Sequence, residues 1–122
     1  ILDEPTAGQD LYGIELLHNI IAELHAQGKT VITITHDIEF AAENFQRIVV
    51  MAHRQILKDG TPEEVFADEP VLNEAMLKGP CSGRLARRLN LHGEILTNEQ
   101  FLDAFCRIYE RGASNEVINK EE

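Results

Sequence analysis

The chain has 122 residues, enough for one domain, and a hydrophobic content of 43%, which is ordinary for a protein with a buried core. Its formal net charge of −10, from 11 basic and 21 acidic side chains, argues against a nucleic-acid partner, because proteins that bind nucleic acid normally carry a basic stripe. The two cysteines, Cys81 and Cys106, have neither CxxC nor Cys/His spacing, so the sequence predicts neither a zinc site nor a disulfide framework.

The first 66 residues predict alternating strands and helices. In chain order these are the end of a buried strand at 1–2, an amphipathic helix at 11–27, a β-branched strand at 30–35, a short helix at 38–44, and strands at 47–52 and 55–58. Asp10 is expected to cap the first helix, and Gly28 is expected to follow its end. This order is typical of an α/β domain with a largely parallel sheet.

From Thr61 onward the sequence predicts helices and no further strands. Thr61-Pro62-Glu63-Glu64 has the pattern of a capped helix start, with Thr61 as N-cap and Glu64 completing a capping box. The further expected elements are a helix at 68–78, a short basic helix at 84–91, a helix from 97 to about 110, and a polar, disordered tail at 112–122. The shift in composition near Ala67 predicts a boundary between an α/β part at 1–66 and a helical extension at 67–111.

The residue pair Asp3 and Glu4 is the first candidate for chemistry. A carboxylate at the carboxyl end of a buried strand can hold hydrated Mg²⁺, and a second one can act as a base toward water. His36 follows the next predicted strand, and ligands of open parallel sheets bind at this edge. The three side chains are therefore expected to converge, with Asp10 near them, in an arrangement suited to nucleotide hydrolysis. Taken alone, Asp3-Glu4-Pro5 is more simply read as a turn with acidic residues.

Three ordered motifs resemble those of the ATP-binding-cassette (ABC) ATPases. Leu2-Asp3-Glu4-Pro5-Thr6 is similar to the end of their Walker B motif, Ala7-Gly8-Gln9-Asp10 to their D-loop, and Thr35-His36-Asp37 to their switch-histidine loop. Residues 47–66 are similar to the segment that follows in transporter members. The resemblance implies that Asp3 binds Mg²⁺ through water, that Glu4 is the general base, that His36 contacts the γ-phosphate of ATP, and that Asp10 bridges two ATPase subunits.

The resemblance also implies a place for the chain in a larger domain. We expect it to be the C-terminal half of a P-loop NTPase-like parallel sheet domain followed by a small helical extension. No GxxxxGK[ST] phosphate loop occurs in these 122 residues, so the piece alone is predicted to be inactive.

The implied function is that of an ABC importer subunit, which couples ATP hydrolysis to transport of a small solute. Gln9, where most members have leucine, points to the energy-coupling-factor branch, whose solutes are vitamins and metal ions. The implied partners are a second ATPase subunit and transmembrane subunits at the cytoplasmic face of the membrane, with no nucleic acid. The alternatives are a non-transport ABC ATPase of DNA repair or translation, and an inactive dimerising remnant.

Two features of the predicted extension have more than one interpretation. Arg84, Arg87 and Arg88 could contact phosphate or an acidic partner, or form a solvated basic face. The apolar stripe between Phe101 and Tyr109 fits a core or a subunit contact, and the resemblance implies that the extension serves dimerisation.

Overall fold

The structure is a computed structural model that describes residues 1–118, with side chains described through Tyr109. Its elements are β1 (Leu2–Asp3), α1 (Leu11–Ala26), β2 (Thr33–Ile34), α2 (Ile38–Asn44), β3 (Ile48–Ala52), β4 (Gln55–Gly60), α3 (Pro62–Ala67), α4 (Glu69–Glu74), α5 (Cys81–Arg88) and α6 (Asn98–Ile118). The chain is therefore a mixed α/β protein, as the sequence predicts.

The strands form two separate sheets of two strands each. β1 and β2 are parallel, with Leu2 opposite Thr33 and Asp3 opposite Ile34. β3 and β4 are antiparallel, so the expectation of a largely parallel sheet holds only for the first pair. The reason is the connection at His53 and Arg54, both with positive φ (51° and 64°), because a two-residue turn of this kind can join only antiparallel strands.

The helices of the first part begin and end where the sequence predicts. The Asp10 carboxylate accepts a hydrogen bond from the Gly13 backbone N–H at 2.8 Å, and α1 ends before Gly28, which has a φ of 73°. A residue with that φ is normally glycine, since a Cβ makes the left-handed conformation unfavourable. α2 occupies the predicted range and packs on α1, with the His18 and Phe40 rings edge to face at 5.4 Å.

The main hydrophobic core lies between the β3–β4 hairpin and the helices α3 and α4. It consists of the buried side chains of Val50, Val65, Phe66 and Leu72, with Ile38 and Ala42 of α2 packed at its edge. Each such side chain contributes about 1.5–3 kcal/mol when fully buried. The capping box of Thr61 and Glu64 is present as predicted and fixes the start of α3 above this core. Leu72 lies beyond the boundary predicted near Ala67, yet it packs in the same cluster as Val50.

The later helices differ from their predicted lengths. α4 ends at Glu74 instead of continuing to 78, because Met76 takes a φ of 55° and the chain turns back, with Leu77 N–H donating to the Leu72 carbonyl at 2.8 Å. α5 begins at Cys81, before the predicted start at 84. The disordered tail predicted at 112–122 is corrected for 112–118, where α6 continues as helix to Ile118, and 119–122 lie outside the described residues.

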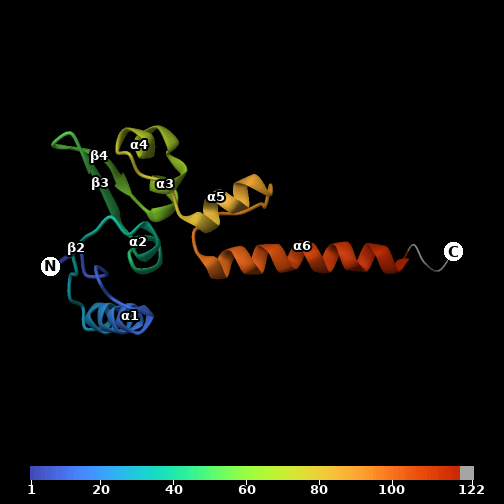
Figure 1. The fold of residues 1–122 in the computed structure, drawn as a ribbon, viewed down its shortest axis with the longest axis horizontal. Helices are drawn as coiled ribbons and strands as arrows, with labels where there is room; N and C mark the ends of the chain where they lie inside the picture. The colour runs from blue at the N-terminus through green and yellow to red at the C-terminus, as the bar shows by residue number, and fades with distance from the viewer. Residues whose placement is uncertain (119–122) are drawn as a thin grey trace.

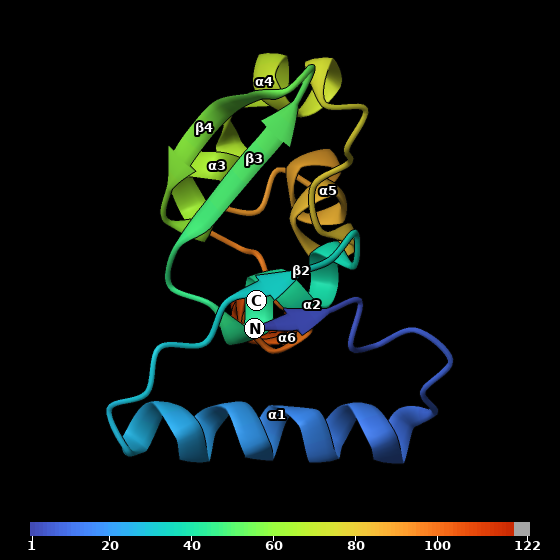
Figure 2. The same ribbon diagram turned by 90° about the vertical axis from the view of Figure 1, so that its left-hand side faces the viewer.

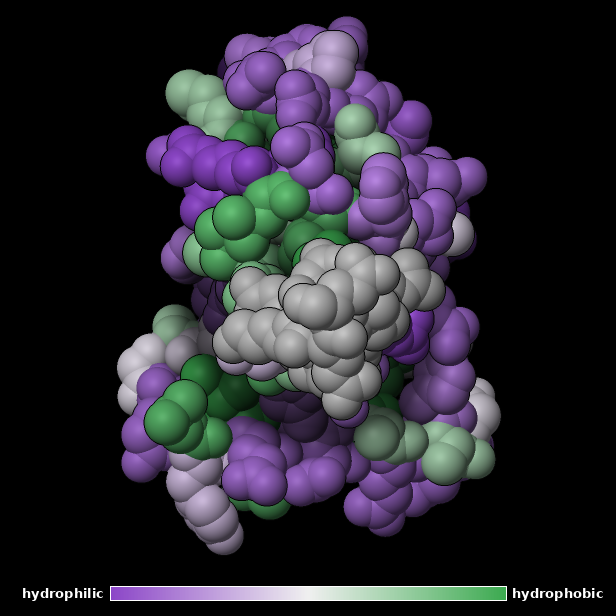
Figure 3. Space-filling model, turned by 90° about the vertical axis from the view of Figure 1, so that its right-hand side faces the viewer, coloured by the Kyte–Doolittle hydropathy of each residue, from purple (hydrophilic) through white to green (hydrophobic). Residues whose placement is uncertain are grey.

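The elements are arranged around β1, β2 and α2. α1 lies on one side and the β3–β4 hairpin with α3 and α4 on the other (Figures 1 and 2). α6 extends beyond the rest of the molecule (Figure 1). Seen from the C-terminal end, hydrophilic residues dominate the surface and apolar residues are exposed in separate patches between them (Figure 3). Within residues 1–118, no helix combines the length and apolar character needed to cross a bilayer.

Candidate functional site

The candidate site lies at the carboxyl ends of β1 and β2. Because the two strands are parallel, the residues that follow them meet at one edge of the sheet. The pairing continues to Glu4, whose backbone N–H donates to the Ile34 carbonyl at 2.8 Å. This hydrogen bond brings Glu4 beside the loop Thr35-His36-Asp37, as the sequence predicts.

Glu4 and His36 are in direct contact. The Nδ1 atom of His36 lies 2.9 Å from Oε2 of Glu4, and the exposed fractions of the two side chains are 83% and 37%. With Nδ1 directed at the carboxylate, the Nε2 atom of the same ring is left for another partner. The pair is therefore accessible and has one ring nitrogen available for a ligand.

Thr35 is a third member of the site, and no role was predicted for it. Its hydroxyl donates to Oε2 of Glu4 at 3.3 Å and accepts a hydrogen bond from the Asp37 backbone N–H at 3.0 Å. The Asp37 carboxylate in turn accepts from the Phe40 N–H and caps α2. Thr35 thus positions the Glu4 carboxylate and also fixes the loop that carries His36. The signal in the sequence was the threonine immediately before His36.

The backbone at Glu4 is unusual. Its φ of 44° lies in the left-handed region, which is uncommon for residues with a long side chain. Such conformations cost about 1–3 kcal/mol and are concentrated at functional sites. Pro5 and the hydrogen bond from the Ala7 N–H to the Glu4 carbonyl, at 3.1 Å, form the turn that holds it. This strain was not predictable from residue spacing.

The contact shifts the proton affinities of both partners. The hydrogen bond from His36 is the largest cause that lowers the pKa of Glu4, and the hydrogen bond to Glu4 is the largest cause that raises the pKa of His36. The pair therefore favours a carboxylate next to an imidazolium. Both groups are exposed to solvent, which weakens the interaction relative to a buried pair.

Asp10 and Asp3 occupy different positions around this pair. The Asp10 carboxylate caps α1 through Gly13, and no described hydrogen bond or ion pair links it to Asp3 or Glu4. Asp3 is exposed at the end of β1, opposite Ile34. Glu4 and His36 are therefore in contact. Asp10 was predicted to lie near Asp3 and Glu4, but no described contact joins it to either residue.

Asp3 is compatible with a magnesium ligand. Its carboxylate is exposed, and no hydrogen bond or ion pair involving it is found in the part of the chain that the structure describes. Mg²⁺ is usually held by one or two carboxylates together with phosphate oxygens and water, so a single free carboxylate at the strand end fits. In the same described part, no group of three or more acidic, histidine or cysteine side chains forms a metal cage.

Comparison with known proteins identifies several with similar sequences. No family model matches it. The chain is 37% identical over 124 residues to "Energy-coupling factor transporter ATP-binding protein EcfA2" of Mycoplasmopsis synoviae (strain 53), a match that covers 99% of this chain and 40% of that protein. It is 42% identical over 93 residues to the protein of the same name from Methanospirillum hungatei JF-1, covering 76% of this chain and 23% of that protein.

A third relative is "Energy-coupling factor transporter ATP-binding protein EcfA" of Methanocaldococcus jannaschii, 38% identical over 90 residues, with 74% of this chain and 32% of that protein covered. The chain thus spans less than half the length of these relatives. Their names agree with the family that the motifs around Glu4 and His36 resemble. The chain belongs to the ATP-binding proteins of ABC transporters, and its relatives include those of the energy-coupling factor type.

Proposed function

We propose that this chain forms part of an ATP-hydrolysing site that drives transport of a small solute across a membrane. The observation that carries the proposal is the contact of 2.9 Å between Glu4 and His36 at neighbouring ends of parallel strands. A base and a hydrogen-bond donor within reach of one point are what hydrolysis of a terminal phosphate requires. The relatives are named as transporter ATP-binding proteins, which supports the same reaction.

In this proposal Glu4 is the general base. Its carboxylate accepts a proton from the attacking water, while the water oxygen forms a bond to the γ-phosphorus and the bond to the ADP oxygen breaks. Thr35 keeps the carboxylate in place through its hydroxyl. His36 donates from its ring to the γ-phosphate, for which the exposed side chain is suitably placed.

The remaining predicted roles belong to Asp3 and Asp10. Asp3 would hold Mg²⁺ through water, and the ion would supply charge neutralisation for the phosphate oxygens. Asp10 would bridge to a second ATPase subunit, for which its exposure beside the start of α1 leaves access. We propose further that the 122 residues by themselves bind MgATP weakly, since they contain no GxxxxGK[ST] loop.

The proposed assembly pairs two ATPase subunits with transmembrane subunits at the cytoplasmic face of a membrane. The energy-coupling-factor names among the relatives favour a vitamin or metal ion as the transported solute. Residues 67–111 would form the extension that helps the two subunits pair. The exposed apolar side chains of α6, Leu102, Phe105 and Ile108, are suited to such a contact.

The test is ATP hydrolysis by the full-length subunit that contains this chain. Glu4→Gln should lower turnover by about 10²–10⁴-fold with nucleotide binding retained, because the amide keeps the shape and loses the base. Glu15→Gln, an exposed change on α1 with the same loss of charge, is the matched control and should hydrolyse ATP normally. Turnover of Glu4→Gln equal to that of the control would remove Glu4 from the role of base.

A further inference from the structure

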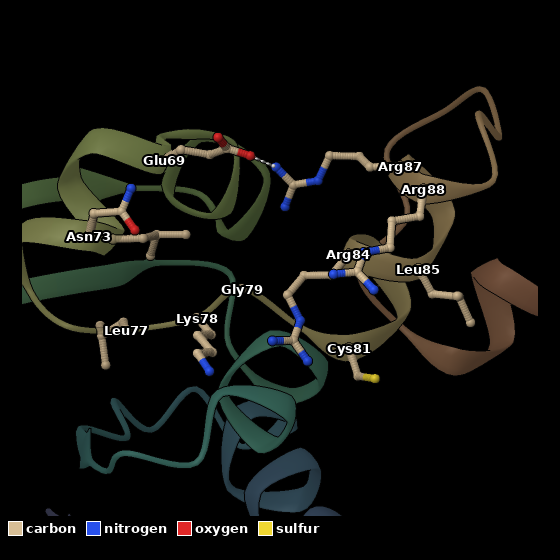
Figure 4. Close-up of a pocket in the computed structure, with 11 residues that line it drawn as sticks. Glu69, Asn73, Leu77, Lys78, Gly79, Cys81, Arg84, Leu85, Arg87 and Arg88 are labelled. Carbon is tan, nitrogen blue, oxygen red and sulfur yellow. Dashed lines mark hydrogen bonds and ion pairs between the residues drawn. The ribbon is translucent and has the colours of Figure 1, made fainter.

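A cavity with a volume of about 560 Å³ lies between α4 and α5, away from the Glu4–His36 site. Figure 4 shows its two sides, with Glu69 and Asn73 from α4 facing residues of α5 across the space. The volume falls in the range of small-molecule binding sites, which is about 300–1,000 Å³.

The lining of the cavity is strongly basic. It includes Lys78 from the loop after α4 and Arg84, Arg87 and Arg88 from α5, which are four of the 11 basic residues in a chain with 21 acidic ones. The carboxylate that lines the same space, Glu69, is already bound to Arg87 at 2.7 Å. Within the described residues, no ion pair is found for the other three cations. Like charges gathered in one space repel each other unless an anion balances them.

Apart from Asn73, the remaining large side chains of the lining are apolar. Leu72, Leu77 and Leu85 contribute to the walls, and Leu72 is buried in the main core. The three arginines are exposed on one helix, as they would also be in a solvated basic face, so the observation that distinguishes the cavity is its fourth cation and its leucine walls. Here a lysine from a separate segment joins them around a hollow with leucine walls. This combination matches a ligand that has an anionic group on a small organic body.

We propose that this cavity binds a small phosphate-bearing ligand, held by Lys78, Arg84 and Arg88. Arginine is suited to the tetrahedral phosphate because its planar donors can form two parallel hydrogen bonds, and lysine adds a point charge. Arg87 keeps the two walls together through Glu69 and is not needed for the ligand. A ligand in this position contacts the loop after α4 on one side and α5 on the other. Its binding therefore stabilises the packing of α5 against the core.

The experiment is calorimetric titration of the 122-residue chain with inorganic pyrophosphate at low ionic strength, with the same titration followed by backbone amide NMR. We expect saturable binding and shifts of the amides of Lys78, Arg84 and Arg88. Arg84→Gln and Arg88→Gln should each weaken binding by roughly tenfold. Arg107→Gln, which removes the same charge from the exposed surface of α6, is the control and should change the dissociation constant less than twofold.

A second arm separates free phosphate ligands from phospholipid headgroups. Vesicles of phosphatidylglycerol are sedimented with the chain and with the same three variants. Pyrophosphate binding without vesicle binding assigns the site to a soluble ligand, whereas vesicle binding lost in Arg84→Gln and Arg88→Gln assigns the phosphate to a lipid.

The proposal is overturned if neither probe binds, or if Arg107→Gln weakens binding as much as the cavity variants do. The second outcome would mean that charge anywhere on the surface attracts the probe. Because Arg84 and Arg88 are exposed, both variants are expected to fold, and circular dichroism checks this before each titration.

Discussion

Glu4 and His36 lie within 2.9 Å of each other although the whole of α1 separates their strands in the sequence. The contact depends on the parallel register of β1 and β2, which places the two loops at the same edge. It also depends on the left-handed backbone at Glu4, which turns the chain immediately after the strand. The contact between Glu4 and His36 therefore forms only when both the strand register and the turn at Glu4 are in place.

The first prediction concerns the proton affinity of His36. Because Glu4 is the main cause that raises the pKa of His36, Glu4→Gln should lower that pKa. Titration of the His36 ring signals by NMR in the wild-type chain and in Glu4→Gln measures the difference. A His36 pKa that is the same in both proteins would show that the contact is absent in solution.

The same shifts determine how the pair contributes to stability at different pH values. Glu4 has a lowered pKa, so its contribution is present above the reference value of 4.5 and is lost as the pH falls through the folded-state pKa. His36 has a raised pKa, so its contribution is present below the reference value of 6.5 and is lost as the pH rises through the folded-state pKa. The stabilising effect of the pair should thus be greatest between these two values. Thermal unfolding of wild type and Glu4→Gln, measured from pH values well below to well above this interval, tests the expected maximum, and a difference independent of pH would contradict it.

The second prediction compares two helical glycines. A Cβ at Gly83 in α5 would lie 2.6 Å from the Ile95 backbone carbonyl oxygen, so Gly83→Ala should lower the free energy of unfolding by about 1–3 kcal/mol. A Cβ at Gly13 in α1 would meet only side-chain atoms of Gln9, the closest being the terminal amide oxygen, which can move, and the next its Cβ at 3.2 Å. Gly13→Ala should therefore raise the free energy of unfolding by up to about 1 kcal/mol through helix propensity.

Urea denaturation of both alanine variants measures whether each substitution lowers or raises the free energy of unfolding. The comparison isolates the close approach of α5 to Ile95, because both substitutions add the same methyl group to a helix. Stabilisation by Gly83→Ala would mean that the segment around Ile95 does not pack on α5 as described.

The third prediction concerns Thr33 in β2, whose hydroxyl oxygen is buried without a hydrogen-bond partner among the described residues. Thr33→Val replaces the hydroxyl with a methyl group on a similar shape and removes the cost of burying an unpaired polar group. The free energy of unfolding should rise by about 1 kcal/mol. Thr30→Val, at an exposed position before the strand, should change it by less than about 0.5 kcal/mol. A lower free energy of unfolding in Thr33→Val would show that the Thr33 hydroxyl has a hydrogen-bond partner in solution.

The fourth prediction concerns MgATP and the 122-residue chain. Most nucleotide affinity in phosphate-loop proteins comes from backbone N–H groups and a lysine at a helix start, and no such loop occurs in these residues. Calorimetry should detect no binding with a Kd of about 1 μM or tighter. A tight complex would mean that the Glu4–His36 site holds the nucleotide without such a loop.

Local signals in the sequence predicted the element ends that depend on caps. The predicted caps Asp10 and Thr61 each accept a backbone hydrogen bond at the start of a helix from a residue only three positions away. Asp37 does the same at the start of α2, although no cap was predicted there. The convergence of Glu4 and His36 was also predictable, since it follows from parallel strands and the motifs at their ends.

Other features depend on conformations that residue spacing does not encode. The antiparallel β3–β4 pair results from positive φ at His53 and Arg54, neither of which is a glycine. The early end of α4 results from the left-handed Met76, again at a residue that does not signal a turn. The strain at Glu4 and the grouping of Lys78 with the arginines of α5 appear only when the folded chain is seen.

The central claim is that Glu4 and His36 act together in ATP hydrolysis, and a double-mutant cycle in the full-length subunit tests it most directly. Turnover is measured for Glu4→Gln, for His36→Ala and for the double variant, with His25→Ala on the exposed side of α1 as control. Residues that act as a unit are strongly non-additive, so the double variant should be no slower than the slower single variant, each single change lowering kcat by about 10²–10⁴-fold. Fully additive losses, or normal turnover in His36→Ala, would contradict the claim.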